Sequence, residues 1–207
     1  MKDLFSVDGK VAIVTGGSRG IGEMIAAGYL ANGAKVYISS RKADVCNATA
    51  KRLGEQFGGE CISLPADMSN LAGIEAFAEE FKARENHLDI LVNNAGTSQR
   101  GPFLEVSDEL WQNDLDLKLF AAIRLSRLVL PSMQEKRWGR IINVLNTAAK
   151  APGAEGAPTA VSRAAGMALT KVLAGEAAKH NVLVNALLVG LIAVSYTHLT
   201  LPTKRIV

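Results

Sequence analysis

The sequence predicts a single-domain α/β fold in which a doubly wound parallel sheet carries helices on both faces. Two observations predict it. Short apolar runs bounded by turn residues alternate along the chain with longer segments of helical periodicity, which is the pattern of βαβ units. The chain has 207 residues, of which 48% are hydrophobic, so it is long enough for one large core and short for two domains.

In the first half of the chain, each predicted strand leads through turn residues into a helix. The strand Val11–Thr15 runs into a glycine-rich turn and then into the helix Ile21–Asn32. The strand Lys35–Ser39 is followed by the helix Ala43–Phe57, which ends at Gly-Gly before the strand Cys61–Leu64. Because each helix separates two strands, the strands are expected to run in the same direction.

In the second half the same alternation continues. The longest predicted helix covers Asp108–Lys136, and the buried strand Arg140–Val144 follows it. No segment repeats at a fixed period, so no repeat architecture is expected. The remaining elements are the helices Leu71–Glu85 and Val161–His180 and the strands Ile90–Asn93 and Leu183–Leu188.

Charge and composition exclude several classes of partner. The net charge of +3 comes from 23 basic and 20 acidic residues spread along the chain, without a basic block that would follow a nucleic-acid backbone. The N-terminus has no apolar signal segment, and the apolar runs are too short to span a membrane. Cys46 and Cys61 lack CxxC spacing and neighbouring His residues. We therefore expect a cytoplasmic protein without a nucleic-acid, membrane or metal partner.

A glycine-rich turn follows the first predicted strand. Gly16 allows a tight turn, Gly20 lets the backbone approach a pyrophosphate, and Gly22 allows the helix to pack closely on the sheet. The free N–H groups and the dipole at the start of the helix favour an anion. The position of this turn between the first strand and the first helix indicates a dinucleotide site, and the alternative is a turn that binds nothing.

The end of the second predicted strand favours NADP(H) over NAD(H). An acidic residue there would bind the ribose hydroxyls of NAD, but Ser40 and Arg41 occupy these positions. Arg41, together with Arg19 of the glycine-rich turn, carries a guanidinium that can bind the oxygens of a 2′-phosphate in pairs. The alternative for Arg41 is a solvated arginine at the start of a helix.

Two signatures at a suitable separation give the chain a family resemblance. Residues Thr15–Gly22 read TGGSRGIG and match a Thr-Gly-x-x-x-Gly-x-Gly signature, and Asn93–Gly96 read NNAG after the fourth predicted strand. With Asp67 after the third strand and Val184-Asn185 on the sixth, the pattern resembles the short-chain dehydrogenases/reductases over roughly residues 5–192. The resemblance implies a Rossmann-like fold and an oxidoreductase.

The resemblance also implies which residues bind the cofactor. In this family the glycine-rich turn lines the pyrophosphate, residues after the third strand contact the adenine, and the second signature lies along the central part of the cofactor. The corresponding residues are Gly16, Ser18, Arg19, Gly20 and Ile21 at the pyrophosphate, Asp67 and Met68 at the adenine, and Asn94, Ala95 and Gly96 at the centre.

Four catalytic positions follow from the same resemblance, and all four carry other residues here. The family uses a Tyr as proton donor, a Lys that lowers the pKa of this Tyr, a Ser that binds the carbonyl oxygen, and an Asn on the preceding long helix. In this sequence the four positions, in the same order, hold Thr159, Arg163, Asn146 and Lys118.

These replacements change the acid–base chemistry of the predicted site. The hydroxyl of Thr159 has no accessible acidic pKa, so it needs another acid in order to donate a proton. Asn146 can still donate an N–H to a carbonyl oxygen, and Arg163 can still bind ribose hydroxyls. Lys118 is the new group that can titrate, provided that burial and Arg163 lower its pKa.

Three functions remain open at this point. The chain binds NADP(H) and reduces a carbonyl or oxidises an alcohol with Lys118 as acid or relay; or it binds the cofactor without turnover, as a regulatory or interaction module; or it folds without working. Paired cations at Lys118 and Arg163 would suit an anionic substrate. Structural roles are the alternatives: Lys118 can snorkel from a helix face, and Arg163 can pair with Asp114 or Asp116. Thr159 can be an N-cap or first-turn residue of a helix with a satisfied hydroxyl.

The last residues differ in character from the rest of the chain. Residues 195–207 read SYTHLTLPTKRIV and have no periodicity, so we expect a domain over residues 1–194 followed by a non-native or frameshifted tail. The resemblance implies that the fold is truncated before its last strand. It also implies a homodimer through the helices at 108–136 and 161–180.

Overall fold

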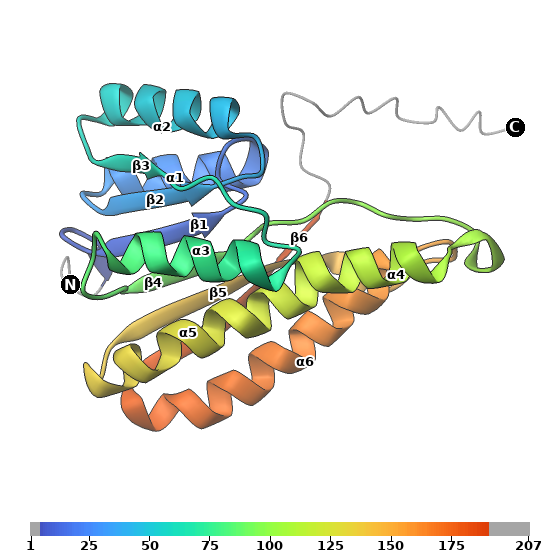
Figure 1. Cartoon of the computed structure of the whole chain (residues 1–207). Helices are drawn as coiled ribbons and strands as arrows, with labels where there is room; N and C mark the ends of the chain where they lie inside the picture. The colour runs from blue at the N-terminus through green and yellow to red at the C-terminus, as the bar shows by residue number, and fades with distance from the viewer. Residues whose placement is uncertain (1–4, 191–207) are drawn as a thin grey trace, which may run out of the picture.

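In the computed structural model, which describes residues 5–190, six strands form one parallel sheet (Figure 1). The strands are β1 Val11–Thr15, β2 Lys35–Ser39, β3 Cys61–Ser63, β4 Ile90–Asn93, β5 Gly139–Asn146 and β6 Val182–Val189. Their order in the sheet is β3-β2-β1-β4-β5-β6, so β1 pairs with β2 on one side and with β4 on the other. The predicted parallel sheet is confirmed.

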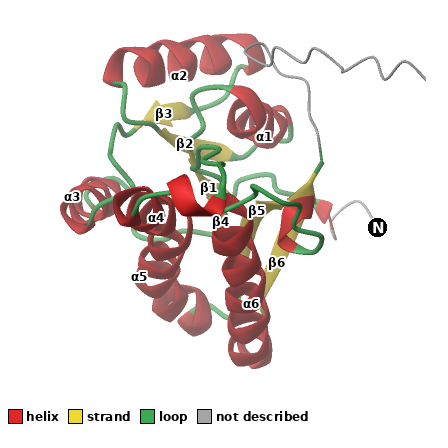
Figure 2. Cartoon of the chain, turned by 90° about the vertical axis from the view of Figure 1, so that its right-hand side faces the viewer, coloured by secondary structure: helices red, strands yellow, loops and turns green. Residues whose placement is uncertain are grey.

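Helices cover both faces of this sheet, so the fold is doubly wound as predicted (Figure 2). The helices are α1 Gly20–Ala31, α2 Ala43–Phe57, α3 Leu71–Lys82, α4 Asp108–Leu115, α5 Ala121–Glu135 and α6 Thr159–Ala177. Side chains of α1 and α2 pack on one face, and side chains of α3, α5 and α6 pack on the other.

The central strand shows why the strands are continuous apolar runs. Ile13 of β1 belongs to the core under α3, α5 and α6, whereas Ala12 and Val14 belong to the core under α1 and α2. None of the three is more than 2% exposed. Because successive residues of a strand point to opposite faces, a strand covered on both faces must be apolar at every position.

The helix predicted over Asp108–Lys136 is interrupted. After α4 a π-helical segment covers Asp116–Phe120, and α5 begins directly after it. A π-helical turn inserts an additional residue into the helix and changes the direction of the side chains that follow. Lys118 lies in the middle of this segment, so the interruption affects the position of a predicted site residue.

Other helix boundaries differ from the prediction by one residue, as at both ends of α1, or by more, as in α3 and α6. α3 ends at Lys82 instead of Glu85, and the Glu85 carboxylate accepts a hydrogen bond from the Tyr37 hydroxyl at 2.7 Å. α6 begins at Thr159 instead of Val161 and continues after Ala177 as a 3₁₀ turn.

The topology places a crevice at the carboxyl ends of β1 and β4. The chain leaves β1 through α1 on one face and leaves β4 through α4 and α5 on the other, so the two connections diverge at this edge. In parallel α/β sheets, ligands bind at such a switch point. The glycine-rich turn follows β1 and the NNAG segment follows β4, so both signatures lie there.

Three predictions concern residues outside the described range of 5–190: the domain end at 194, the tail over 195–207 and the truncation before a last strand. Within the described range, no helix combines the length and the apolar character needed to span a membrane.

Candidate functional site

A cleft of about 990 Å³ opens at the carboxyl ends of the central strands. Its walls come from the turn after β1, the end of β2, the segment after β4, the end of β5 and the start of α6. The predicted site residues line it, except for Gly20, Asp67 and Lys118. The predicted residues that line it are Gly16, Ser18, Arg19, Ile21, Arg41, Met68, Asn94, Ala95, Gly96, Asn146, Thr159 and Arg163.

Glycines shape the cleft at the turn after β1. Gly16 has a φ of +66°, which favours glycine, and a Cβ there would lie 3.0 Å from the Cα of Ala95. A Cβ on Gly22 would lie 2.3 Å from the carbonyl oxygen of Gly16 and 2.5 Å from Asn94 Nδ2. The close packing predicted for Gly22 is therefore confirmed.

Thr15 and Asn94 connect the two signatures by hydrogen bonds. Thr15 Oγ1 accepts from the backbone N–H groups of Asn94 and Ala95 at 2.9 and 3.0 Å. The side-chain amide of Asn94 donates to the carbonyl oxygens of Thr15 and Gly16 at 2.9 and 3.3 Å. These bonds satisfy backbone groups at the crowded strand ends and hold the glycine-rich turn in place.

The end of β2 presents a hydroxyl and a cation to the cleft. Ser39 is fully buried, and its Oγ has no hydrogen-bond partner within residues 5–190. Arg41 is exposed and lines the same end of the cleft. A buried hydroxyl without a partner loses hydrogen-bond energy that a ligand can restore, so this end suits a ligand with hydroxyl and anionic groups.

Asp67 and Gly20 lie beside the cleft. Asp67 Oδ1 accepts from the backbone N–H and the hydroxyl of Ser69 at 2.9 and 2.8 Å, which forms an Asx turn. The neighbouring Met68 is 2% exposed and lines the cleft. The carboxylate of Asp67 therefore orders the turn that positions Met68. Gly20, with a φ of +59°, begins α1.

Asn146 ends β5 and lines the cleft with an incompletely bonded amide. Its buried Oδ1 has no hydrogen-bond partner in the part of the chain that the structure describes. Buried polar side chains normally find a partner, so a bound ligand would complete this amide.

Lys118 is buried behind Thr159 and does not line the cleft. Its side chain is 0% exposed, and Nζ donates to the hydroxyl oxygen of Thr159 at 2.7 Å and to Asp114. The same Thr159 oxygen accepts the backbone N–H of Gln99 at 3.0 Å. Lys118 thus reaches the cleft through the hydroxyl of Thr159, and the snorkelling alternative is wrong.

Asp114 is the centre of this buried network. It is 1% exposed, and while one carboxylate oxygen accepts from Lys118, the other accepts from the Ser162 hydroxyl at 2.6 Å. The Thr159 hydroxyl, on the first residue of α6, also lies within 3.3 Å of Asp114. The hydroxyl of Thr159 can therefore donate its proton either to Asp114 or into the cleft.

The pKa of Lys118 is lowered to about 8. Burial is the main cause, and the charge of Arg163 also lowers this pKa, whereas the hydrogen bond and charge of Asp114 raise it. The lowered pKa expected from burial and Arg163 is confirmed in direction. A lysine with such a pKa can hold and release a proton near neutral pH.

Arg163 lies against Gly96. A Cβ on Gly96 would be 2.6 Å from a terminal nitrogen of Arg163, whose other terminal nitrogen donates to the carbonyl oxygen of Val144 at 2.9 Å. Pairing of Arg163 with Asp114 or Asp116 was one structural alternative. Within the described residues Arg163 forms no ion pair with either aspartate, so this alternative is wrong. Asp114 pairs with Lys118, and Asp116 lies 3.6 Å from Arg124.

The predicted pair of cations for an anionic substrate is also wrong. Arg163 lines the cleft, but the ammonium of Lys118 is paired with Asp114 and lies behind Thr159. The two positive charges are therefore not presented together to a ligand.

Sequence reasoning missed three members of the network around Thr159. The pairing of Asp114 with Lys118 could have been found, because four residues separate them on a predicted helix. Ser162 and Gln99 carry no such signal. Ser162 comes from α6, and Gln99 contributes a backbone N–H that any residue could supply.

A parallel sheet whose switch point carries a glycine-rich turn and a cleft defines a dinucleotide-binding α/β protein. Among such proteins, the sequence profile described as short chain dehydrogenase matches residues 10–204 of this chain. The chain therefore belongs to the short-chain dehydrogenase family, and the predicted resemblance is confirmed.

Known relatives show what the chain is similar to. A rhamnolipid-biosynthesis 3-oxoacyl-(acyl-carrier-protein) reductase of Pseudomonas aeruginosa is 36% identical over 195 residues, which cover 92% of this chain and 75% of that protein. The 3-oxoacyl-(acyl-carrier-protein) reductase FabG of Salmonella typhimurium is 33% identical over 192 residues, which cover 93% of this chain and 77% of that protein.

One similar solved structure contains a bound cofactor. The crystal structure of L-sorbose reductase from Gluconobacter frateurii, complexed with NADPH and L-sorbose, matches with a TM-score of 0.89 at 36% identity. The match covers 92% of this chain and 72% of that one. The NADPH in that complex agrees with the preference for NADP(H) predicted from Arg41.

Proposed function

We propose that this chain is an NADP(H)-dependent oxidoreductase that reduces a carbonyl group of a small molecule or oxidises the corresponding alcohol. The observation that carries the proposal is the 2.7 Å hydrogen bond from Lys118 Nζ to Thr159 Oγ1, because it joins a titratable group to the hydroxyl of a residue that lines the cleft. The three reductases described above support the reaction class.

The cleft has suitable groups for each part of NADP(H). The N–H groups at the start of α1 suit the pyrophosphate. The unpartnered hydroxyl of Ser39 and the guanidinium of Arg41 suit the adenosine ribose and its 2′-phosphate. Gly96 and Asn146 line the same cleft, and in this proposal they would contact the nicotinamide end of the cofactor and the substrate. When bound, the cofactor supplies or accepts a hydride.

Replacing Arg41 by alanine is expected to weaken NADPH binding about 10- to 100-fold and to change NADH binding much less. A hydrogen bond to a charged group contributes about 1.5–3 kcal/mol, and NADPH would lose this contribution at its 2′-phosphate. NADH has no 2′-phosphate, so its binding does not include this hydrogen bond. Fluorescence titration with both cofactors measures the effect. Arg52→Ala is the control, because Arg52 lies on α2 outside the cleft and pairs with Glu23 at 2.7 Å. Equal losses for the two cofactors would contradict the role of Arg41.

In the proposed reduction, the carbonyl oxygen of the substrate lies against Thr159 Oγ1 and the amide of Asn146. As the hydride adds to the carbonyl carbon, the oxygen takes the hydroxyl proton of Thr159, and Thr159 takes a proton from Lys118 Nζ. The N–H of Asn146 stabilises the negative charge that develops on the oxygen. Lys118 becomes neutral and regains a proton between turnovers, and alcohol oxidation follows the reverse path.

Replacing Thr159 by valine is expected to lower kcat for NADPH-dependent carbonyl reduction about 100- to 10,000-fold, the usual contribution of acid–base catalysis. Thr170→Val is the matched control, because Thr170 is a buried threonine of the same helix whose hydroxyl donates to Gly166 O at 2.8 Å, away from the cleft. A panel of ketones and aldehydes provides the substrate. Similar losses for both variants would mean that Thr159 acts through folding alone.

The pH dependence tests Lys118. Reduction requires the protonated amine, whose pKa is about 8, so the rate of reduction should fall as the pH rises through this value. The rate of alcohol oxidation should rise over the same range, because it requires the neutral amine. Rates that stay constant between pH 7 and 9, roughly one unit on either side of this pKa, would remove Lys118 from the mechanism.

Cofactor binding without turnover is the second candidate function. The burial of Lys118 against Asp114 favours it, because a closed ion pair that bonds the Thr159 hydroxyl is complete without a substrate. Saturable NADPH binding with no turnover across the panel would support this function. Turnover of any carbonyl compound would exclude it.

We also propose a homodimer through the segments 108–136 and 161–180. Val161 and Val172 on α6 are 49% and 56% exposed, which leaves apolar surface on this helix. Sedimentation velocity should then give twice the chain mass of 21.9 kDa, and a monomer at micromolar concentration would overturn the proposal.

A further inference from the structure

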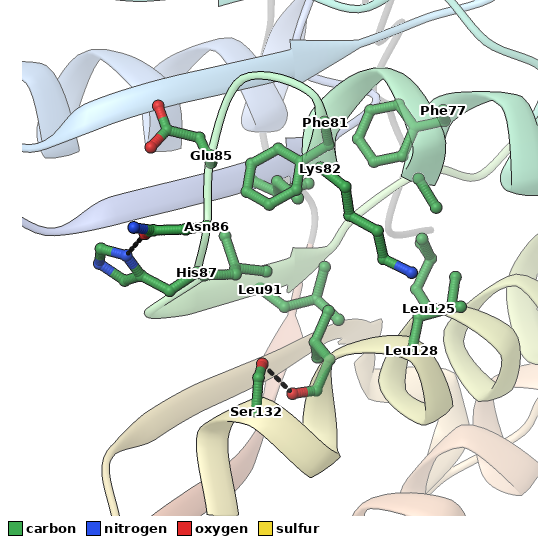
Figure 3. Close-up of a pocket in the computed structure, with 14 residues that line it drawn as sticks. Phe77, Phe81, Lys82, Glu85, Asn86, His87, Leu91, Leu125, Leu128 and Ser132 are labelled. Atoms are coloured by element: carbon green, nitrogen blue, oxygen red, sulfur yellow. Dashed lines mark hydrogen bonds between the residues drawn. The ribbon is translucent and has the colours of Figure 1, made fainter. Parts of the chain in front are cut away.

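A second cavity, apart from the nucleotide cleft, lies on the face of the sheet that α3 and α5 cover, close to the start of β4 (Figure 3). Its volume is about 350 Å³, which is in the range of small-ligand pockets. It opens between the C-terminal half of α3, the segment before β4, and α5. Leu88 of this cavity precedes β4 whereas Asn94 of the cleft follows it, so β4 separates the two sites.

The wall of this cavity is mainly apolar. Phe77 and Phe81 of α3 contribute from one side, Leu125 and Leu128 of α5 from the other, and Leu91 of β4 lies between them (Figure 3). Leu128 is 37% exposed, although Leu125 one turn earlier is 3% exposed. Within one chain, an apolar ligand would therefore remove from water the part of Leu128 that the fold leaves accessible.

Most polar groups around the cavity already have partners. Glu85 accepts from the Tyr37 hydroxyl at 2.7 Å and pairs with Lys35 at 2.9 Å. The Ser132 hydroxyl donates to a carbonyl oxygen of its own helix at 3.1 Å. His87 lies 3.4 Å from a carboxylate oxygen of the neighbouring aspartate. None of these groups needs a ligand.

Lys82 differs from them. It is exposed at the end of α3, lines the cavity, and makes no hydrogen bond or ion pair with residues 5–190. In Figure 3 its side chain extends from α3 toward Leu125 and Leu128, so the ammonium lies at the apolar cavity. A cation without a partner at the mouth of an apolar pocket is complementary to an amphipathic anion.

We propose that this cavity binds a monoanion with an unbranched apolar chain, namely an aliphatic carboxylate. The chain lies between Phe77, Phe81 and Leu125, and the carboxylate pairs with Lys82. This site is separate from the nucleotide cleft, so the proposal goes beyond the proposed oxidoreductase function and does not depend on it.

Calorimetric titration of the full chain with hexanoate, octanoate and decanoate tests the proposal. We expect the affinity to rise about fourfold for each added methylene, as for chain burial in an apolar site. Octanoate should bind up to about fivefold more tightly than 1-octanol, because its carboxylate pairs with an exposed cation. Binding should persist in the presence of saturating NADPH. Absence of octanoate binding, or competition by NADPH, would overturn the proposal.

Two variants locate the ligand. Ala78 lines the cavity and is half-buried, so Ala78→Phe should fill it and abolish octanoate binding. Lys82→Gln should lower octanoate affinity to that of 1-octanol and leave 1-octanol unchanged. The control is Lys51→Gln, because Lys51 is 78% exposed on α2, across the sheet. Octanoate binding that survives in a folded Ala78→Phe variant would overturn the site. If that variant does not fold, an unchanged preference for octanoate in Lys82→Gln would do so.

Discussion

Replacing Lys118 by methionine is expected to lower the free energy of unfolding by about 3–5 kcal/mol. Methionine fills a similar volume, but it leaves the carboxylate of Asp114, which is 1% exposed, without its cation. The Ser162 hydroxyl would still donate to one oxygen at 2.6 Å, so the other oxygen loses its charged donor. Urea denaturation followed by circular dichroism measures the loss.

Removing both charges should restore most of this stability. In Asp114→Leu/Lys118→Met neither charge of the buried pair remains, and the Ser162 hydroxyl can still donate to the carbonyl oxygen of Thr159 at 3.1 Å. The matched control is Lys51→Met, because Lys51 and Glu55 have the same helical spacing but are 78% and 70% exposed. This control should change the free energy of unfolding by less than about 0.5 kcal/mol. A similarly small effect at Lys118 would contradict the importance of burial.

The double variant also separates folding from chemistry. It should fold and bind NADPH, but kcat for any carbonyl substrate should fall about 100- to 10,000-fold, because Lys118, the group that returns a proton to the Thr159 hydroxyl, is absent. Undiminished turnover in a folded double variant would show that the proton of Thr159 comes from elsewhere.

Replacing Gly22 by alanine is expected to weaken NADPH binding by at least about 100-fold. The added Cβ would lie 2.3 Å from Gly16 O and 2.5 Å from Asn94 Nδ2, so the glycine-rich turn and its link to β4 must move. Losing two backbone hydrogen bonds to a charged pyrophosphate, each contributing about 1.5–3 kcal/mol, gives this magnitude. Overpacking should also lower the free energy of unfolding by about 1–3 kcal/mol.

Gly28 provides the control within the same helix. A Cβ on Gly28 would meet no atom within 4 Å, so Gly28→Ala should stabilise α1 by about 0.5–1 kcal/mol and leave NADPH binding unchanged. Fluorescence titration and urea denaturation of both variants give the comparison. If Gly22→Ala behaved like Gly28→Ala, the crowding at the glycine-rich turn would not matter for the cofactor.

The fold was largely predictable because its determinants are local. β1, β2 and β4 begin and end where the apolar runs predict, since strands covered on both faces are apolar throughout. The π-helical segment Asp116–Phe120 was not predictable, because its residues have the same apolar spacing as an uninterrupted helix. That segment carries Lys118, so the predicted uninterrupted helix also gave no correct position for this site residue.

By itself the sequence determined the parallel α/β fold, the glycine-rich turn and the family, because these depend on short patterns along the chain. Only the tertiary structure decided that Lys118 lies behind Thr159, paired with Asp114, and that Arg163 lies against Gly96. Lys118 and Thr159 are 41 positions apart in the chain. The protonation of a lysine depends on its burial and on every charge packed around it, and no local pattern contains that information.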